Sequence, residues 1–550
     1  MCTSTKILLL LLACSFSTVA AQNTVGLLNL DSNRAYDGYN LIYPHNQPTS
    51  YLLDNCGRVV HSWPDSAQYR PGNTSYLLAN GNLAKTKRLA NSPTNDPIWA
   101  GGGGAIVEIR DWDNNLLWQF EQNSAEKRLH HDIAPMPNGN ILMISWEVKT
   151  KAEAIAMGRN PELLENWDAI WPDYILEVDP STDEVVWEWH AWDHLIQDFD
   201  PEKANFGEVA AHPELIDLNY QTNDGHPDWL HVNAIDYNPE LDQILISVPT
   251  FSEVWVIDHS TTTEEAAGHT GGNAGKGGDL LYRWGNPLAY RQGAAADQKL
   301  FYPHDLHWVA TPGYEGQLAV FNNRVAPTYS TVNLFTPPFN STTSDYDYNG
   351  GAYGPEQFDR TVVHPDTLPL SSSGLSSVQV LPNDNLLICS GRNGYSFEIT
   401  PDNEVVWEYR TPLIAGQPAV QGASLGLNDN LTFRIKRYDT NYPAFEGKDL
   451  SPKGYIELEP NSGFCGNIVS VMPQPAPPAT IKVYPNPTSG WANIEAERAC
   501  TAFLLNSMGQ LVQTLYLKKG QQQLSLEQHP AGLYWLETQK GKPQKIILTR

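Results

Sequence analysis

The sequence predicts an all-β protein, a six-bladed β-propeller followed by a small C-terminal β-sandwich domain. Two observations lead to this prediction. First, a strand, a tight Asn/Asp/Gly turn and a second strand recur along the chain, and several copies precede another hairpin that ends near a tryptophan. Second, a proline-rich stretch separates this repetitive body from a tail of short alternating apolar runs. Repeated four-stranded units around an axis make a propeller, and short alternating strands punctuated by Gly and Pro are typical of a sandwich.

The first 21 residues have the pattern of a secretory signal peptide. Lys6 precedes the apolar run ILLLLLACSFSTVAA, and small residues lie before Gln22. This run is too short for a stable membrane span, and no later run approaches the roughly 20 apolar residues that a span requires. A lipoprotein processing site at Cys14 is the alternative interpretation. We therefore expect residues 1–21 to be removed from an exported chain that has no stable membrane span.

Six copies of an inner hairpin set the expected number of blades. Each copy has two apolar strands joined by a tight turn, as hairpin chemistry requires. The copies lie at 76–84, 133–145, 235–247, 309–321, 378–389 and 425–435. We therefore expect a propeller of six blades over residues 22–470, with seven blades as the alternative.

The outer hairpins carry tryptophans near matching ends. These tryptophans are Trp63, Trp118, Trp187, Trp284 and Trp407. The first outer hairpin, residues 51–63, comes before the first inner copy, and the last inner copy has no outer hairpin after it. This arrangement predicts a ring closed by residues near 51–63 pairing with the strands after 425. The fifth outer hairpin is obscured and is expected within 325–365.

A proline-rich linker, residues 471–480, leads into the tail, residues 481–550. The tail has 8 basic and 4 acidic residues, whereas the whole chain has 35 Lys and Arg against 62 Asp and Glu. The body is therefore strongly acidic, which argues against nucleic acid as a partner. The cysteines that remain after processing are Cys56, Cys389, Cys465 and Cys500. They allow one disulfide but contain no CxxC metal motif.

Insertions between the repeats mark the loops, where function is commonly carried. About 100 residues separate the second and third inner turns, and residues 150–171 among them are helical in composition. The segment EEAAGHTGGNAGKGGD, residues 264–279, is rich in glycine but does not follow a strand into a helix. We therefore expect a flexible loop there and not a phosphate-binding motif.

Three histidines recur at matching positions before an inner turn. Aligned on the apolar run, HDIAP, HVNAI and HDLHW place His131, His231 and His304 in one structural position. The first strand of each blade lines the channel, so we expect the three imidazoles to converge there. Two other interpretations remain open, histidines that only pack between strands and histidines that bind a metal ion. Because no HExxH motif or matching carboxylate is present, we expect no metal and no cofactor.

Other basic residues flank this position. His130 and His307 are expected in structural or supporting roles. Arg324 ends the second strand of the His304 hairpin, and Arg392 holds a similar place in the next blade. In so acidic a body, imidazole N–H groups and a guanidinium fork form a local anion site that suits a tetrahedral oxyanion.

The motifs together resemble the bacterial arylsulfotransferase family over most of residues 25–440. HVNAIDYNPELDQILIS, GDLLYRWGNP, PHDLHWV and LPNDNLLICSG carry the resemblance. The resemblance implies a six-bladed propeller that moves a sulfuryl group from an aryl sulfate to a phenol, without a nucleotide sulfate donor. It also implies a channel histidine that is transiently sulfated, while other histidines and an arginine hold the sulfate.

This sequence does not contain all of the residues that the family uses at its site. His231 and His304 match two of the channel histidines, and Arg324 matches the arginine approximately. The family's nucleophilic histidine is expected near 374–376, where this sequence reads SSSGLSSVQ and has no histidine. Either His304 or His231 takes the nucleophile's part, or the sulfate passes directly between substrates, or the activity is lost.

The tail resembles the C-terminal sorting domain of the type IX secretion pathway of Bacteroidetes. VYPNP, GQLV, PAGLYWLE and the basic end match that pattern over the whole tail. The resemblance implies that the type IX machinery carries the protein from the periplasm to the cell surface or the medium and that the tail is removed. An ordinary accessory β-domain is the alternative.

The sequence thus predicts an exported aryl sulfotransferase that acts on small aryl sulfates and phenols. The expected catalytic residues are His131, His231 and His304, and the expected substrate-binding residues are Arg324 and Arg392. A non-catalytic propeller that binds a ligand or glycan at the cell surface is the alternative, and the missing histidine favours it. A metal- or cofactor-dependent hydrolase or lyase is the third class.

Overall fold

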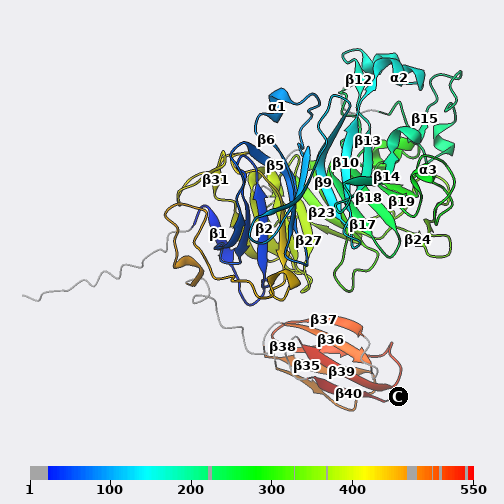
Figure 1. Cartoon of the computed structure of the whole chain (residues 1–550). Helices are drawn as coiled ribbons and strands as arrows, with labels where there is room; N and C mark the ends of the chain where they lie inside the picture. Colours follow the sequence, from blue (N-terminus) through cyan, green and yellow to red (C-terminus); the bar gives the residue numbers. More distant parts are fainter. Residues whose placement is uncertain are drawn as a thin grey trace, which may run out of the picture. The chain divides into compact units, whose positions relative to one another are not determined.

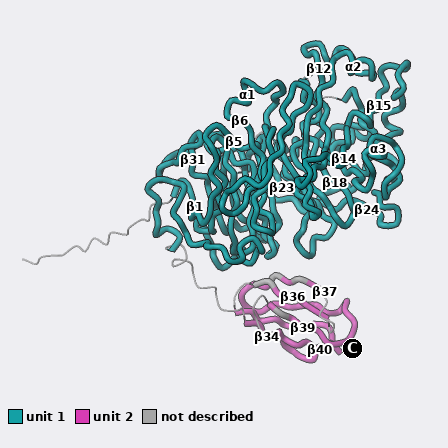
Figure 2. The backbone as a smooth tube through the Cα atoms, in the orientation of Figure 1, with its two compact units in different colours: residues 1–469 teal, residues 470–550 magenta. Residues whose placement is uncertain are grey.

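The computed structural model describes residues 23–220, 226–326, 329–366, 370–466, 480–497, 500–506, 511–538 and 543–549. The predicted signal peptide and all of the predicted linker except its last residue lie outside these ranges. The chain divides into two compact units, residues 1–469 and 470–550 (Figure 2). Within the described ranges, no helix has the length and apolar character needed to cross a membrane.

The large unit contains, among its described residues, six antiparallel sheets of four or five strands (Figure 1). From the channel outward, the first three sheets are β33 (Thr432–Tyr438), β2 (Tyr39–Pro44), β3 (Ser50–Asp54) and β4 (Val59–Trp63); β5 (Tyr69–Leu77), β6 (Leu83–Leu89), β7 (Ile106–Arg110) and β8 (Leu116–Glu121); and β9 (Lys127–Pro135), β10 (Ile141–Glu147), β13 (Asp173–Asp179) and β14 (Glu184–His190). The other three are β17 (Ala234–Asn238), β18 (Gln243–Val248), β19 (Glu253–Asp258) and β20 (Tyr282–Trp284); β21 (Pro303–Trp308), β22 (Leu318–Ala326), β23 (Tyr329–Phe335) and β26 (Arg360–Val362); and β27 (Ser377–Val380), β28 (Leu386–Ser390), β29 (Tyr395–Ile399), β30 (Val405–Arg410) and β1 (Gly26–Leu30).

The innermost strands of the six sheets form a closed circuit. Each of β5, β9, β17, β21 and β27 contacts the innermost strand of the next sheet, and β33 completes the circuit by contacting both β27 and β5. This is the arrangement of a β-propeller, the fold that the repeats predict. The fifth outer pair, β23 and β26, lies within 325–365 as expected.

Short elements fill the connections between the sheets. The helices are α1 (Ser92–Asn95), α2 (Lys151–Ala156) and α3 (Thr263–Ala266). The short strands are β11 (Lys149–Thr150), β12 (Ala169–Ile170), β15 (Leu195–Ile196), β16 (Ile216–Asp217), β24 (Phe339–Asn340), β25 (Asp345–Tyr346), β31 (Leu413–Ile414) and β32 (Gln417–Pro418). Only part of the segment 150–171, which is helical in composition, is helical in the structure: α2 and a 3-10 helix at Pro161–Leu164. Helix α2 begins with a capping box between Thr150 and Glu153.

Both ends of the large unit take part in closing the ring. Its last strand, β33, pairs with β2, and β3 and β4 follow in the same sheet, so the predicted closure by residues 51–63 is confirmed. A second junction was not predicted: β1 adds a fifth strand to the last sheet by pairing with β30. A disulfide between Cys56 and Cys465 links the two ends again, and Cys389 is a buried free thiol.

The prediction of a sixth inner hairpin at 425–435 is wrong. Residues 425–431 contain no strand, and β33 begins at Thr432. Leu427 in this segment is 61% exposed, so its apolar residues do not form a buried face. The turn chemistry of Asn428 to Asn430 is present, but the hydrogen-bonding partner of β33 is β2, which comes from the other end of the chain.

The predicted tryptophans connect neighbouring sheets. Each lies in the fourth strand of its sheet, and its indole N–H donates to the segment between the third and fourth strands of the next sheet. The bonds run from Trp63 to Asp111 O (3.1 Å), from Trp118 to Asp183 Oδ1 (2.6 Å), from Trp187 to Thr261 Oγ1 (3.2 Å), from Trp284 to Pro355 O (2.9 Å) and from Trp407 to Asn55 O (2.8 Å). An indole fills apolar space and still needs a partner for its single donor, which explains why tryptophan recurs at this position.

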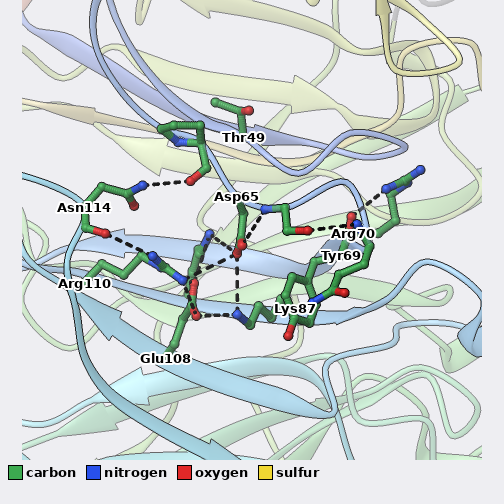
Figure 3. A network of polar contacts seen from close by, with 12 residues as sticks. Thr49, Asp65, Tyr69, Arg70, Lys87, Glu108, Arg110 and Asn114 are labelled. Atoms are coloured by element: carbon green, nitrogen blue, oxygen red, sulfur yellow. Dashed lines mark hydrogen bonds and ion pairs between the residues drawn. The ribbon is translucent and has the colours of Figure 1, made fainter.

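Buried charges on the second sheet are paired with one another (Figure 3). Glu108 accepts a hydrogen bond from Arg110 Nε at 2.7 Å, and its carboxylate lies 3.1 Å from Lys85 Nζ and 2.6 Å from Lys87 Nζ. Burial alone would raise the pKa of Glu108, but the Arg110 hydrogen bond and the two lysine charges hold it at about 2. Asp65 lies 3.2 Å from Lys85 Nζ, so the lysines are neutralised by two carboxylates.

Arg434, on the closing strand β33, joins three other sheets at the channel. Its Nη2 lies 2.8 Å from Asp132 Oδ2 on β9, and its Nε lies 2.5 Å from Asp305 Oδ1 on β21. It also contacts the hydroxyl of Tyr76 on β5, and that hydroxyl donates to Asp132 Oδ1 at 2.7 Å. Charge-assisted bonds of this kind are directional, so Arg434 fixes the innermost strands relative to one another.

The small unit has two antiparallel sheets. One contains β34 (Ile481–Tyr484), β35 (Trp491–Ala496) and β38 (Gly520–Ser525), and the other contains β37 (Leu511–Leu517), β36 (Cys500–Asn506), β39 (Gly532–Thr538) and β40 (Gln544–Leu548). Buried residues of both sheets, among them Ile494, Leu504 and Leu536, form one hydrophobic core. Two sheets that share a core make a sandwich, as the tail sequence predicts.

We predict that Arg434→Met lowers the free energy of unfolding by about 3–5 kcal/mol, because it leaves two buried carboxylates without a cation. Urea denaturation at neutral pH measures the change. Arg34→Met is the matched control, since Arg34 also pairs with two carboxylates, Asp31 and Glu404, but at the surface. The control should cost no more than about 1 kcal/mol. Equal effects of the two substitutions would contradict the role of Arg434.

Candidate active site

The three predicted histidines come from three consecutive sheets. His131 lies in β9, His304 lies in β21, and His231 precedes β17. The φ angles of His131 and His231 are 52° and 57°, and Asp305, the residue after His304, has a φ of 52°. Left-handed backbone is uncommon for residues other than glycine and concentrates at functional sites. His131 and His231 therefore share a left-handed backbone conformation, whereas beside His304 the left-handed residue is the next one in the chain.

Five aromatic rings form a closed circuit around the channel. The centroid distances are 4.6 Å for His131 and His231, 5.9 Å for His231 and Tyr302, 5.8 Å for Tyr302 and His304, 6.2 Å for His304 and Phe433, and 6.5 Å for Phe433 and His131. The structure thus brings the three histidines around one point, with Tyr302 and Phe433 completing the wall.

His231 is held by a carboxylate. Its Nδ1 contacts Asp228 Oδ2, and Asp228 Oδ1 accepts a hydrogen bond from Trp146 Nε1 at 2.8 Å. A carboxylate accepts and cannot donate, so it fixes the proton of a neutral imidazole on Nδ1 and leaves the lone pair on Nε2. The same carboxylate can stabilise positive charge that develops on the ring. His231 therefore has the arrangement of a nucleophile or a base.

His304 is held by an amide whose orientation is fixed. Asn323 Nδ2 donates to the carbonyl oxygens of Ser372 and Leu375, both at 3.0 Å, so Asn323 Oδ1 must face His304 Nδ1, 2.8 Å away. The proton of His304 is consequently on Nδ1 and the lone pair is on Nε2. Burial lowers the pKa of His304 to about 3, and the charge of His231 contributes. His304 is therefore neutral at physiological pH.

His131 is backed by His130, which was expected in a supporting role. The two Nδ1 atoms are 2.8 Å apart, and His130 Nε2 lies 2.9 Å from Asp173 Oδ1. Burial lowers the pKa of both histidines well below the usual value and raises the pKa of Asp173 well above it. A Cβ at Gly102 would lie 2.0 Å from the ring of His131, so only glycine allows this ring position.

A cavity of about 520 Å³ opens beside the circuit of rings. Its lining includes His231, Asp228, Tyr302, Arg324, Thr250 and Asn286. The volume lies within the range of small-molecule sites. His131 and His304, each 3% exposed, are not among the described residues that line it. Of the three predicted histidines, His231 is therefore the one that lines this cavity, together with His226.

Arg324 is the predicted arginine that reaches this cavity. Its guanidinium carbon lies 3.6 Å from the centroid of the Tyr302 ring, and its Nε donates to Ser373 O at 2.9 Å. Arg392 lies in the short 3-10 helix η7 (Gly391–Asn393), where its backbone N–H donates to Ser372 Oγ at 3.2 Å. It is not among the described lining residues of the cavity. Of the two predicted arginines, Arg324 therefore lines the cavity and Arg392 does not.

The segment 374–376 lies beside His304 but supplies no imidazole. A Cβ at Gly374 would lie 4.0 Å from His304 Cε1. Ser376 has a φ of 92°, so this sheet also turns through left-handed backbone before its innermost strand. Its hydroxyl accepts a hydrogen bond from Gly391 N at 3.0 Å. A Cβ at Gly374 therefore has room beside His304, whereas Ser376 is fully buried.

Sequence reasoning missed four residues of this site. Tyr302, Asp228 and Asn323 each lie within three residues of a residue that was predicted, so their neighbourhood was a usable signal. Phe433 had no such signal, because it lies in the segment that was wrongly predicted to be a hairpin. Its place in the site follows from the closure of the ring by β33.

Comparisons with known families and structures define the class of protein. An arylsulfotransferase (ASST) family model matches residues 32–411, and a secretion system C-terminal sorting domain model matches residues 482–549. The first match supports a sulfotransferase-type enzyme, and the second marks an exported protein whose tail interacts with secretion machinery. The chain belongs to the arylsulfotransferase family.

Solved structures that match this chain have little sequence in common with it. A protein of unknown function from Bacteroides caccae is 13% identical, with a TM-score of 0.37, over 68% of this chain and 93% of that chain. Virginiamycin B lyase from Staphylococcus aureus is 8% identical, with a TM-score of 0.32, over 75% of this chain and 99% of that chain. These scores carry no argument about the site. The comparison with curated proteins finds no match.

We predict that His304 stays neutral, with its proton on Nδ1, from pH 8 down to about pH 4, because its pKa is lowered to about 3. Nitrogen NMR of histidine-labelled protein measures the tautomer, and the signal lost in His304→Gln assigns it. Between about pH 6.5 and pH 3 the unfolded form takes up a second imidazole proton that the folded form does not, so the contribution of His304 to stability falls as the pH falls through this range. A signal that titrates near pH 6.5 would contradict the assignment.

Proposed function

We propose that the protein is an exported aryl sulfotransferase that moves a sulfuryl group from an aryl sulfate donor to a phenolic acceptor without a nucleotide sulfate donor. The observation that carries the proposal is that His231 and Arg324 line one cavity, in a chain whose family is arylsulfotransferase. A guanidinium and a carboxylate-supported imidazole on one cavity suit an anionic ester that must be both held and attacked.

In the first step, the Nε2 lone pair of His231 attacks the sulfur of the aryl sulfate. The S–O bond to the aryl group breaks, its electron pair leaves with the aryl oxide, and an N–S bond forms. Asp228 balances the positive charge that the imidazole gains, and Arg324 binds the peripheral oxygens, on which a loose transition state places negative charge. Tyr302, fixed under Arg324, offers a face on which an aryl ring can stack.

In the second step, the phenol oxygen of the acceptor attacks the same sulfur. The electron pair of the N–S bond returns to His231 Nε2, and the phenol proton passes to a neutral base. His304 is our candidate for this base, because its bond to Asn323 holds the proton on Nδ1 and leaves the lone pair on Nε2. It then gives the proton to the aryl oxide released in the first step or to solvent. His131 acts behind His231 as a packing and positioning residue.

The non-catalytic alternative has one specific observation in its favour. Gly374 and Ser376 stand where the family resemblance leads us to expect the nucleophilic histidine. A propeller that binds aryl sulfates without turnover would retain the cavity and Arg324 but would form no covalent intermediate. The assay below separates the two functions.

Turnover tests the proposal. Purified protein is incubated with 4-nitrophenyl sulfate, with and without a second phenol, and nitrophenol release and the sulfated acceptor are both measured. We expect release that depends on the acceptor and matches the sulfated product in amount. Release without acceptor would instead show a hydrolase, and binding without any release would show a non-catalytic propeller.

We predict that His231→Ala lowers acceptor-dependent turnover by at least about 10²-fold, the low end for loss of a nucleophile or acid–base group. His304→Ala should cause a similar loss. His307→Ala is the matched control, because His307 is in the same strand as His304 but lines a different cavity. Mass spectrometry of protein quenched without acceptor should find one sulfuryl group on the peptide that contains His231. Full activity of a folded His231→Ala protein would overturn the assignment.

We predict that deleting residues 481–550 leaves this activity unchanged, because the small unit has its own core. The same deletion should abolish delivery to the cell surface, since it removes the sorting domain. Fractionation of cells that express either chain, with turnover measured on purified protein, checks both outcomes. Loss of activity in the purified, folded body would show that the tail contributes to the chemistry.

A further inference from the structure

A second group of histidine and carboxylate side chains lies at the outer edge of the large unit. His194, His269 and Asp279 offer three ligand atoms that all lie within 4.8 Å of one another. Helix α3, which precedes His269, contacts the outer strand β14 (Figure 1). None of the three is among the described residues that line the cavity of His231. This group is therefore separate from the candidate active site.

The three side chains converge on one oxygen. His194 Nδ1 and His269 Nδ1 are each 2.8 Å from Asp279 Oδ1. The two imidazole planes are nearly perpendicular, at 86°, with centroids 5.9 Å apart. The side chain of His194 is fully buried and that of Asp279 is 9% exposed, whereas His269 is 61% exposed. A fixed buried pair thus faces an accessible third ligand.

When the ring of His194 is neutral, its hydrogen bonds leave Nδ1 without a proton. His194 Nε2 lies 2.9 Å from the carbonyl oxygen of Ala266, which can only accept. The single proton of the neutral ring is therefore on Nε2, and the lone pair of Nδ1 points at a carboxylate oxygen 2.8 Å away. Two acceptors that face each other in a buried place require a positive charge between them, which either a second ring proton or a metal ion supplies.

We propose that this group is a binding site for a divalent ion of the zinc class, with His194 Nδ1, His269 Nδ1 and Asp279 Oδ1 as ligands. Two imidazoles and one carboxylate are ligands that zinc prefers, whereas calcium and magnesium prefer oxygen alone. A tetrahedral ion with ligands at about 2.0–2.1 Å sets them about 3.3 Å apart. Each imidazole therefore has to withdraw from Asp279 Oδ1 by a few tenths of an ångström, and the two Nδ1 atoms, which lie within 4.8 Å of each other, have to reach the same spacing. The bond from His194 Nε2 to Ala266 O is the supporting contact that metal-bound histidines commonly make.

The site closes the glycine-rich loop that the sequence predicts at 264–279. His269 lies inside this segment and Asp279 ends it, while His194 comes from the region after β14. A Cβ at Gly278 would lie 2.0 Å from Ala266 O and 2.7 Å from His194 Nε2, so the loop can approach His194 only through glycine. Trp189 Nε1 donates to Gly278 O at 2.7 Å. This loop has few apolar residues of its own. The ion would therefore attach the loop to the edge of the third sheet.

Metal titration tests the site in the full mature chain. Protein freed of metal by chelator and dialysis is titrated with Zn²⁺ by calorimetry and with Co²⁺ by visible absorption, which reports tetrahedral coordination. We expect one equivalent of each ion to bind. His269→Ala and Asp279→Asn should weaken binding by at least about tenfold, since even a supporting contact of a metal ligand is worth that much.

His212→Ala is the matched control for these variants. His212 is an exposed histidine that also contacts a carboxylate, Glu214, at 2.9 Å, and its loss should leave the affinity unchanged. Limited proteolysis gives a readout besides affinity: cleavage within 267–278 should increase when Zn²⁺ is removed or His269 is replaced. Because His269 is exposed, its variant should fold. Failure of the wild-type chain to bind either ion would overturn the proposal, as would binding that His269→Ala and Asp279→Asn do not change, or binding of Ca²⁺ alone.

Discussion

The ion pairs of Arg434 with Asp132 and Asp305 connect the closure of the ring to the placement of the site. Arg434 comes from the strand that completes the circuit, and each carboxylate directly follows one of the channel histidines, His131 and His304. A buried cation between two carboxylates tolerates little displacement, because a break leaves charge uncompensated. The residues that follow His131 and His304 are therefore both tied to β33, the strand that pairs with β2.

The third histidine, His231, is held by a different residue, and this difference gives it different chemical properties. In the copy that contains His231 the next residue is Val232, so no carboxylate reaches Arg434 from that position, and Asp228 holds the ring instead. Three imidazoles at comparable places thus face a carboxylate, an amide and a second imidazole. Because hydrogen-bond partners decide which nitrogen has the lone pair and how basic it is, the repeat yields non-equivalent groups from one residue type.

Local patterns in the sequence were enough to predict most of the fold. Tight turns and the spacing of tryptophans predicted the sheets because each depends on residues close in the chain, such as Trp407 and its hairpin. Pairings between distant segments were harder: β1 with β30, Cys56 with Cys465, and β33 with β2 in place of a hairpin at 425–435.

At the site, the histidines were visible as a repeat, but the roles of Asp132 and Asp305 depend on Arg434, which is far away in sequence. Tyr302 and Phe433 likewise become wall residues only when the ring is closed.

The disulfide between Cys56 and Cys465 has a mechanical consequence for a chain that is exported by its tail. Cys465 lies between β33 and the sorting domain, so a force transmitted along the chain from the tail reaches this cysteine before it reaches β33. From there the covalent bond carries the load to Cys56, between β3 and β4, and past the hydrogen bonds of β33. Pulling on the tail therefore loads the turn between β3 and β4 and does not peel the closing strand β33. Cutting the chain after residue 466 would relieve the load and leave both junctions of the ring in place.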